Sequence, residues 1–196
     1  MKKHTVRIVG GDYRRTPITV IDAAGLRPTP DRVRETLFNW LSHFWQGDFS
    51  GKRVLDLFAG TGALGFESAS RGVAHVQMVE NNPQAVDALR ALKSRLGAMQ
   101  VRVHQGDALK VLERSPAASF DLVLVDPPFQ EQWMDRLWGQ LSAVMHPDGL
   151  LYVESGDNIA PPVAFELVRE GRAGHVHFAL LRFAAMQKTD NNPAVS

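Results

Sequence analysis

The chain has 196 residues, 44% of them apolar and 22% charged, which is the balance of an ordinary globular domain and argues against disordered or fibrous classes. It contains no cysteine, which excludes disulfides, cysteine-ligated zinc, iron–sulfur clusters and thiol nucleophiles. No stretch resembles a signal peptide or is apolar enough to cross a bilayer, so we expect a cytoplasmic protein without a membrane partner.

The charge is distributed unevenly along the chain. The formal net charge is +1, yet residues 1–36 carry eight Lys and Arg against four Asp and Glu, a balance of +4 that leaves −3 for the other residues. A basic segment ahead of a near-neutral body indicates a phosphate-binding arm, although a solvated leader would have the same composition. The candidate nucleic-acid contacts in this segment are Arg7, Arg14, Arg15, Arg27, Arg32 and Arg34.

Local patterns within residues 1–50 favour a structured arm. The stretch from Arg7 to Arg15 is typical of a strand and a turn, which can extend as a hairpin to Val20. A helix is predicted after Asp31 and runs to about Phe44, with an apolar face of Val33, Leu37, Leu41 and Phe44 and with Arg32, Arg34 and Glu35 on its polar faces. We expect residues 1–50 to form a basic extension, residues 51–186 the main domain and residues 187–196 a frayed tail.

After Gly51, short apolar runs alternate with amphipathic stretches, which predicts an α/β domain with helices on both faces of a parallel sheet. The expected strands are Arg53–Phe58, His75–Glu80, Val101–His104, Phe120–Asp126, Leu150–Glu154, Phe165–Arg169 and His175–Phe183. A helix is predicted from Pro83 to Leu96, capped by Asn82 and stopped by Gly97. Another covers Trp133 to Val144, and the residues His146–Gly149 that follow it predict a turn.

A glycine-rich loop follows the first strand of this domain. Gly60 to Gly65 match a dinucleotide fingerprint, and Glu80 at the end of the next strand can bind ribose hydroxyls, so NAD or S-adenosylmethionine could use the loop. Asp56 at the strand end would oppose a pyrophosphate but would attract the ammonium of a methionine moiety, which favours S-adenosylmethionine. Asp107 after the third strand could accept a hydrogen bond from the adenine amine, or simply cap a helix.

The fourth strand ends in Asp126-Pro127-Pro128-Phe129, whose chemistry suits methylation of an exocyclic amine on a planar base. The carboxylate and the Pro127 carbonyl can accept hydrogen bonds from the two N–H groups of the amine. Two prolines stiffen the backbone, and Phe129 can stack on the base. A strand that ends in a simple turn is the alternative interpretation of Pro-Pro.

The motifs Asp56–Gly62, Glu80, Asp107 and Asp126–Phe129, in this order, resemble those of class I S-adenosylmethionine-dependent methyltransferases. The segments Arg7–Gly11 and Arg27–Leu41 are similar to the RsmD family, which methylates guanine N2 in 16S ribosomal RNA, and the similarity runs from about residue 6 to about residue 183. The resemblance implies a Rossmann-like fold with a seven-stranded, mostly parallel sheet, an antiparallel last strand and a small N-terminal extension.

The resemblance also implies roles for particular residues. Asp126, Pro127, Pro128 and Phe129 would hold the guanine and carry the catalysis. S-adenosylmethionine would contact Asp56, Phe58, Ala59, Gly60, Thr61, Gly62, Glu80, Asn81, Asp107, Ala108 and Asp126. The expected partner is 16S rRNA within the small ribosomal subunit or a late assembly intermediate, and the expected state is a monomer. The stretch Arg14–Pro17 lacks a Gly that often separates basic residues in the family, which affects the expected RNA contacts more than the reaction.

Three other functions fit parts of the sequence. The Asp126 motif suits any planar exocyclic amine, so adenine-N6 methylation of DNA or RNA is one alternative. A noncatalytic RNA-binding assembly factor is another. An NAD-dependent oxidoreductase ranks last, because no hydride-transfer partner lies near Gly60. We assign no metal, since His175 and His177 share a strand face without a third ligand nearby.

Overall fold

The computed structural model describes residues 5–20, 29–128 and 133–183. Arg27, Phe129 and the expected tail 187–196 lie outside the described residues. Within the described ranges, no helix combines the length and apolarity that a membrane crossing requires.

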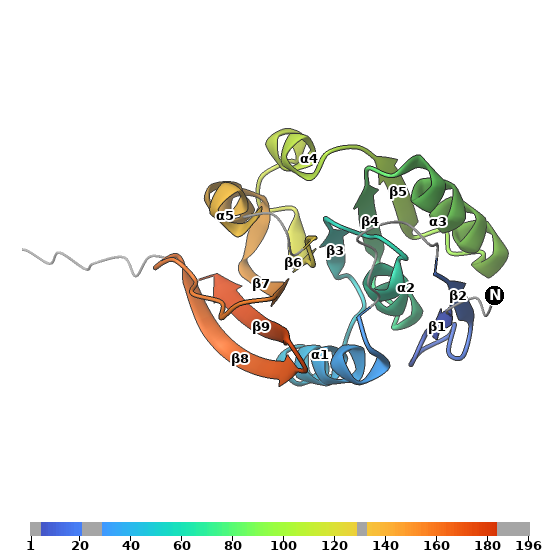
Figure 1. Cartoon of the computed structure of the whole chain (residues 1–196), viewed down its shortest axis with the longest axis horizontal. Coiled ribbons are helices and arrows are strands. Elements are labelled where there is room, and N and C mark those ends of the chain that lie inside the picture. Colours follow the sequence, from blue (N-terminus) through green and yellow to red (C-terminus); the bar gives the residue numbers. More distant parts are fainter. Residues whose placement is uncertain (1–4, 21–28, 129–132, 184–196) are drawn as a thin grey trace, which may run out of the picture.

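A seven-stranded sheet forms the centre of the protein, in the order β5-β4-β3-β6-β7-β9-β8. The strands are β3 (Arg53–Asp56), β4 (His75–Glu80), β5 (Val101–Gln105), β6 (Phe120–Val125), β7 (Met145–Ser155), β8 (Phe165–Ala173) and β9 (Val176–Phe183). Neighbours from β5 to β7 are parallel, and β9 is antiparallel to both β7 and β8. The predicted sheet with an antiparallel last strand is therefore confirmed (Figure 1).

Helices cover both faces of this sheet, and an apolar core fills each face. The helices are α1 (Asp31–Phe44), α2 (Ala63–Ser70), α3 (Pro83–Leu96), α4 (Ala108–Arg114) and α5 (Trp133–Val144). Side chains of α1, α2 and α3 pack in one core with Val54, Leu122 and Tyr152, whereas α4 and α5 pack in the other with Leu55 and Val123. Figure 1 shows α4 and α5 on one side of the sheet and α1 and α2 on the other.

Two local predictions have different outcomes. Helix α3 begins and ends as predicted, because the Asn82 side chain accepts hydrogen bonds from the amides of Gln84 and Ala85, and Gly97 ends the helix with a φ of 62°. The turn predicted at His146–Gly149 is wrong as an element boundary, since these residues belong to β7. Residues 146–149 are not paired with β6: Phe120 lies opposite Met145, and the next pair is Leu122 opposite Leu150, so these residues form an irregularity within the strand.

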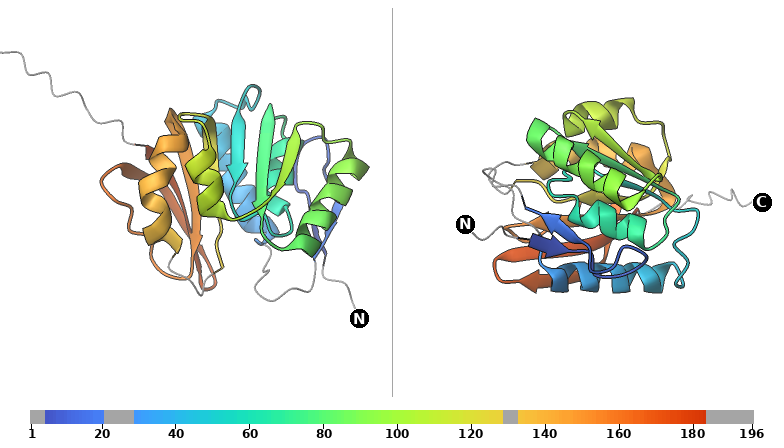
Figure 2. Two further views of the ribbon diagram at one scale, coloured as in Figure 1. Left: turned by 90° about the horizontal axis from the view of Figure 1, so that it is seen from above. Right: turned by 90° about the vertical axis from the view of Figure 1, so that its right-hand side faces the viewer.

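The predicted N-terminal hairpin is present as a separate antiparallel pair, β1 (Thr5–Arg7) and β2 (Pro17–Thr19), with Val6 opposite Ile18. Ile18 is buried in the same core as α1, α2 and α3. The Arg95 guanidinium of α3 donates to the Pro17 carbonyl at 2.7 Å. The hairpin is thus attached to the domain rather than extended from it (Figure 2).

Helix α2 holds the loop of this hairpin through a buried carboxylate. Glu67 is 0% exposed, and its two oxygens accept hydrogen bonds from the amides of Val9 at 2.6 Å and Gly10 at 2.9 Å. The Arg71 guanidinium neutralises Glu67 at 2.9 Å, and the Ser70 hydroxyl accepts from the Tyr13 amide at 2.8 Å. A buried charge is tolerated here because it is paired and hydrogen-bonded. We call these contacts of Glu67 and Ser70 the hairpin clamp.

Candidate active site

Four carboxyl groups lie at the ends of four neighbouring strands. Asp56 ends β3, Glu80 ends β4, Asp126 directly follows β6, and Glu154 lies near the end of β7. Because side chains alternate along a strand, these four share the sheet face of Val54, Met78, Leu124 and Tyr152, which is the face that α1, α2 and α3 cover. Asp126 and Glu154 are adjacent, since Val125 pairs with Val153.

The loop between β3 and α2 is fixed by its glycines and by Glu80. Gly62 precedes α2 with a φ of 80°, and a Cβ at this position would lie 2.4 Å from the Leu89 side chain, so only glycine fits. Glu80 accepts from the Gly60 amide at 2.8 Å with one oxygen and from the Asn82 amide at 2.8 Å with the other. Each oxygen keeps a second acceptor position, which a hydroxyl of a ligand can use.

Asp56 carries the feature most suggestive of a ligand. The residue is 2% exposed, and among the residues that the structure describes its Oδ2 has no hydrogen-bond partner. Burial raises the pKa of Asp56 to about 7 together with the negative charge of Glu80, although the backbone amides of Gly65 and Phe58 act in the opposite direction. A buried carboxyl with an unpartnered oxygen is costly, and an ammonium group beside it would supply both the donor and the charge. The Asp56 carboxyl therefore fits a ligand that carries a cationic amine.

Asp126 is partly buried beside a hydroxyl from the segment before α1. The Thr29 hydroxyl donates to Asp126 Oδ2 at 3.3 Å, which leaves Oδ1 available to a substrate. Burial, the charge of Glu154 and the charge of Asp56 raise the pKa of Asp126 well above its ordinary value. Pro127 is buried and Pro128 is exposed, and Phe129 lies outside the described part of the chain.

The remaining predicted cofactor residues surround the same edge. Asp107 caps α4, because its side chain accepts a hydrogen bond from the Lys110 amide at 3.1 Å. Helix capping, the alternative role predicted for this residue, is therefore at least one of its roles. Ala108 is buried and Asn81 is exposed. The Phe58 ring packs edge-on against Trp133 of α5, with centroids 5.0 Å apart, so the loop after β3 also contacts the helix that follows the Asp126 motif.

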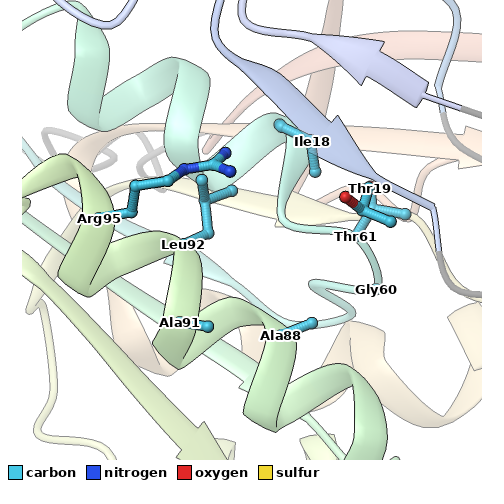
Figure 3. Close-up of a pocket in the computed structure, with 8 residues that line it drawn as sticks. All are labelled: Ile18, Thr19, Gly60, Thr61, Ala88, Ala91, Leu92 and Arg95. Atoms are coloured by element: carbon cyan, nitrogen blue, oxygen red, sulfur yellow. The ribbon is translucent and has the colours of Figure 1, made fainter.

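A cavity of about 230 Å³ opens beside the glycine loop. Gly60 and Thr61 of the loop line it together with Ile18 and Thr19 of β2 and with Ala88, Ala91, Leu92 and Arg95 of α3. Figure 3 shows these residues on β2, on the glycine loop and on α3. The cavity does not coincide with the row of carboxyl groups, but it places β2 next to the loop that is expected to bind the cofactor.

The predicted nucleic-acid contacts are divided between surface and interior. Arg7, Arg14, Arg15 and Arg32 are exposed, and Arg7 forms an ion pair with Asp31 at 2.9 Å. The prediction that Arg34 lies on a polar face is wrong. Arg34 is 0% exposed, because it donates to the Arg7 carbonyl at 2.7 Å and to Asp31 at 2.6 Å beneath the hairpin, so it is not available to RNA.

Sequence reasoning assigned no role to three residues behind Asp126. Thr29, Tyr152 and Glu154 are all at least 96% buried, with 4%, 0% and 2% exposed. Glu154 had a usable signal, since it ends an apolar run at a strand terminus as Asp56 and Glu80 do. Thr29 had none, because 97 residues separate it from Asp126.

Comparisons with known proteins identify the family and the fold. A family model described as conserved hypothetical protein 95 matches residues 6–182. The chain is 36% identical to the ribosomal RNA small subunit methyltransferase D of Escherichia coli K12, in a match that covers 94% of this chain and 93% of that protein. It is 34% identical to the protein of the same name in Haemophilus influenzae, with 91% of this chain and 94% of that protein covered. The solved structure of yhhF from Escherichia coli has a TM-score of 0.81 at 35% identity and covers 93% of this chain and 99% of that one. The fold is that of the class I methyltransferases, and the chain belongs to the RsmD family.

Proposed function

We propose that the protein, acting as a monomer in the bacterial cytoplasm, transfers a methyl group from S-adenosylmethionine to the exocyclic N2 of a guanine in 16S rRNA of the small ribosomal subunit. The observation that carries the proposal is the Asp126 carboxyl, held by Thr29 through one oxygen and followed by two prolines, in the row of strand-end carboxyl groups. The relatives named ribosomal RNA small subunit methyltransferase D support the substrate class.

The chain supplies the groups that a methyl donor of this kind needs. Asp56 would hold the ammonium of S-adenosylmethionine through its carboxylate, and Glu80 would accept from the ribose hydroxyls. Phe58, Asn81 and Asp107 would surround the adenosine. When bound, the cofactor supplies a methyl group on a sulfonium, whose C–S electron pair remains on sulfur as the methyl leaves.

The substrate amine is a poor nucleophile, because its lone pair is delocalised into the guanine ring. Asp126 Oδ1 and the Pro127 carbonyl accept hydrogen bonds from its two N–H groups, which aligns the lone pair for attack and disfavours the planar geometry. The carboxylate then stabilises the positive charge that develops on nitrogen, and the excess proton leaves to Asp126 or to water. No strong base is required, since the proton leaves after the N–C bond has formed.

The exposed basic residues of the N-terminal arm would grip the RNA around the target. Arg14 and Arg15 are exposed in the turn of the hairpin, and β2 of that hairpin lies against the glycine loop. Arg7 and Arg32 lie exposed near the beginning of the arm and of α1. Phosphates flanking an unpaired or flipped guanine would therefore be bound close to the site of chemistry.

The test is transfer of labelled methyl from S-adenosylmethionine to small ribosomal subunits from cells that lack this enzyme, followed by nucleoside analysis. Protein-free 16S rRNA and DNA serve as parallel substrates. The expected product is N2-methylguanosine from the subunits. Label in N6-methyladenine would replace the substrate assignment with adenine methylation, and tight RNA binding without label would favour a noncatalytic assembly factor.

A matched pair of variants ties the activity to the site. Asp126→Asn keeps the size of the side chain but removes its charge and one acceptor, and it should lower turnover about 100-fold or more while the affinity for S-adenosylhomocysteine changes little. Asp157→Asn, in the exposed stretch after β7, should leave both quantities unchanged. Turnover of Asp126→Asn close to that of the native protein would remove Asp126 from the chemistry.

A further inference from the structure

A buried polar cluster of Thr29, Tyr152 and Glu154 lies beside Asp126. The Tyr152 hydroxyl donates to Glu154 Oε1 at 2.8 Å, and both side chains are buried on the α1 face of the sheet. The Thr29 hydroxyl donates to Asp126 Oδ2 at 3.3 Å. Three separate segments of the chain, the one before α1 and the ends of β6 and β7, therefore meet behind one carboxyl.

The Thr29 hydroxyl lies between two carboxyl groups. It donates to Asp126 Oδ2 at 3.3 Å, and it lowers the pKa both of Asp126 and of Glu154, which lie side by side where Val125 pairs with Val153. A hydroxyl has one proton to donate, so it can serve only one of the two carboxyls at a time. In this structure it donates to Asp126, and Glu154 receives its hydrogen bond from Tyr152 instead.

This arrangement determines which oxygen of Asp126 faces the substrate. With Oδ2 bound to Thr29, the carboxyl group cannot rotate freely, and Oδ1 remains the acceptor for the amine. Such a restriction matters for catalysis, because a misaligned acceptor loses much of the advantage of a preorganised site.

We propose that Thr29 and Glu154 are positioning residues for methyl transfer: Thr29 holds Asp126 Oδ2 so that Oδ1 is presented to the substrate amine, and Glu154, held by Tyr152, sets the charge of Asp126 from behind. This inference rests on the proposed function, since Asp126 is taken as the group that binds the amine. It adds a pair of residues with opposite effects on the same carboxyl.

The opposite effects follow from the charges around Asp126. Its charged neighbours are Glu154 on β7 and Asp56 on β3, which raise its pKa, while Thr29 lowers its pKa by donating a hydrogen bond. Glu154 is itself faced by Tyr152, by Thr29 and by the buried Arg34 of α1, all of which lower its pKa against the effect of burial. Removing the charge of Glu154 therefore favours ionised Asp126, and removing the Thr29 hydroxyl disfavours it.

The test is the pH profile of single-turnover methyl transfer at saturating cofactor and RNA, so that changes in affinity do not contribute. In Glu154→Gln the acidic midpoint of the profile should move to lower pH, and in Thr29→Val it should move to higher pH, each by about one unit. Thr29→Ser keeps the hydroxyl and should keep the native midpoint. Tyr152→Phe should shift the midpoint in the same direction as Glu154→Gln, because a Glu154 that loses its donor is more often neutral.

A purely structural role would lower the rate at every pH without moving the midpoint, and shifts in the same direction for Glu154→Gln and Thr29→Val would overturn the inference. A second readout does not depend on turnover. In protein labelled with ¹³C at the aspartate carboxyls, the Asp126 resonance, assigned by its loss in Asp126→Asn, should titrate with the same opposite shifts. If the native protein transfers no methyl but the carboxyl titrations shift as expected, the proposed function fails while the coupling stands; native midpoints in both variants would refute the coupling.

Discussion

Lowering the pH from 7.5 to 5.0 should weaken cofactor binding by nearly two orders of magnitude, because protonation removes the charge of Asp56. The pKa of this carboxyl in the free protein is raised to about 7 by burial and by Glu80. Its ionised fraction falls from about three quarters at pH 7.5 to about one hundredth at pH 5.0. If only the carboxylate binds the ammonium of the ligand, the Kd should rise roughly 80-fold, or about 2.6 kcal/mol.

Calorimetric titration with S-adenosylhomocysteine measures this effect without turnover. The α-amino group of the ligand has an ordinary pKa of about 8 and stays mostly protonated over the range, so its own titration contributes little. Two buffers with different ionisation enthalpies should reveal about half a proton released on binding at pH 7 and nearly one at pH 6. Circular dichroism at each pH checks that the protein remains folded.

The control variant is Asp56→Asn, which is uncharged at every pH. It should bind more weakly than the native protein at pH 7.5 and should lose nearly all of the pH dependence. A native Kd that stays within threefold between pH 7.5 and 5.0 would show that Asp56 does not bind the ammonium, and so would an Asp56→Asn variant that keeps the native slope.

Three further predictions concern stability and RNA binding. Folding raises the pKa of Asp56 from 3.8 to about 7, so the contribution of this carboxyl to stability is complete below pH 3.8 and is lost as the pH rises through 7. At pH 8 the Asp56→Asn variant should therefore unfold at higher urea than the native protein, with a free energy of unfolding that is larger by up to about 4 kcal/mol. The free energies of the two proteins should converge toward pH 4. Glu67→Ala removes the centre of the hairpin clamp and should cost about 3 to 5 kcal/mol in urea unfolding, and a loss below about 1 kcal/mol would contradict the clamp. Arg14→Ala combined with Arg15→Ala should reduce the salt slope of RNA binding by about 2, whereas Lys110→Ala on α4 should leave it unchanged, and an equal slope in both variants would refute the arm.

Local signals were sufficient where both ends of an element are determined by its own residues. Helix α3 starts at Asn82 and Pro83 and stops at Gly97, and all three act through contacts within a few residues. The strand ends could be predicted for a similar reason, since apolar runs that stop at a carboxylate mark the edge of a parallel sheet. The row of Asp56, Glu80 and Asp126 was therefore visible in the sequence.

The burial of Arg34 was partly visible as well. Arg34, Leu37, Phe38 and Leu41 follow the spacing i, i+3, i+4 and i+7, and all four are buried in α1. The type of residue concealed this pattern, because an arginine normally marks a polar face. Its burial depends on the Arg7 carbonyl, which the hairpin brings to it from another part of the chain.

The role of Thr29 could not be predicted, because it depends entirely on tertiary structure. A threonine between two prolines has no periodicity, and its partner Asp126 is 97 residues away. The extent of β7 was also beyond local reasoning. Pro147 and Gly149 indicate a turn by themselves, but the ladder with β6 resumes at Leu150 and includes them in one strand.

The hairpin clamp has a consequence for the order in which the protein is made. The ribosome synthesises Val9, Gly10 and Tyr13 first, yet their partners Glu67 and Ser70 follow 57 to 60 residues later. The hairpin therefore cannot dock during early elongation and must wait until α2 has emerged and folded. Since α2 begins directly after Gly62, the same event that anchors the basic arm also completes the glycine loop. A nascent chain that stops before Glu67 would expose its arginines without a cofactor site behind them.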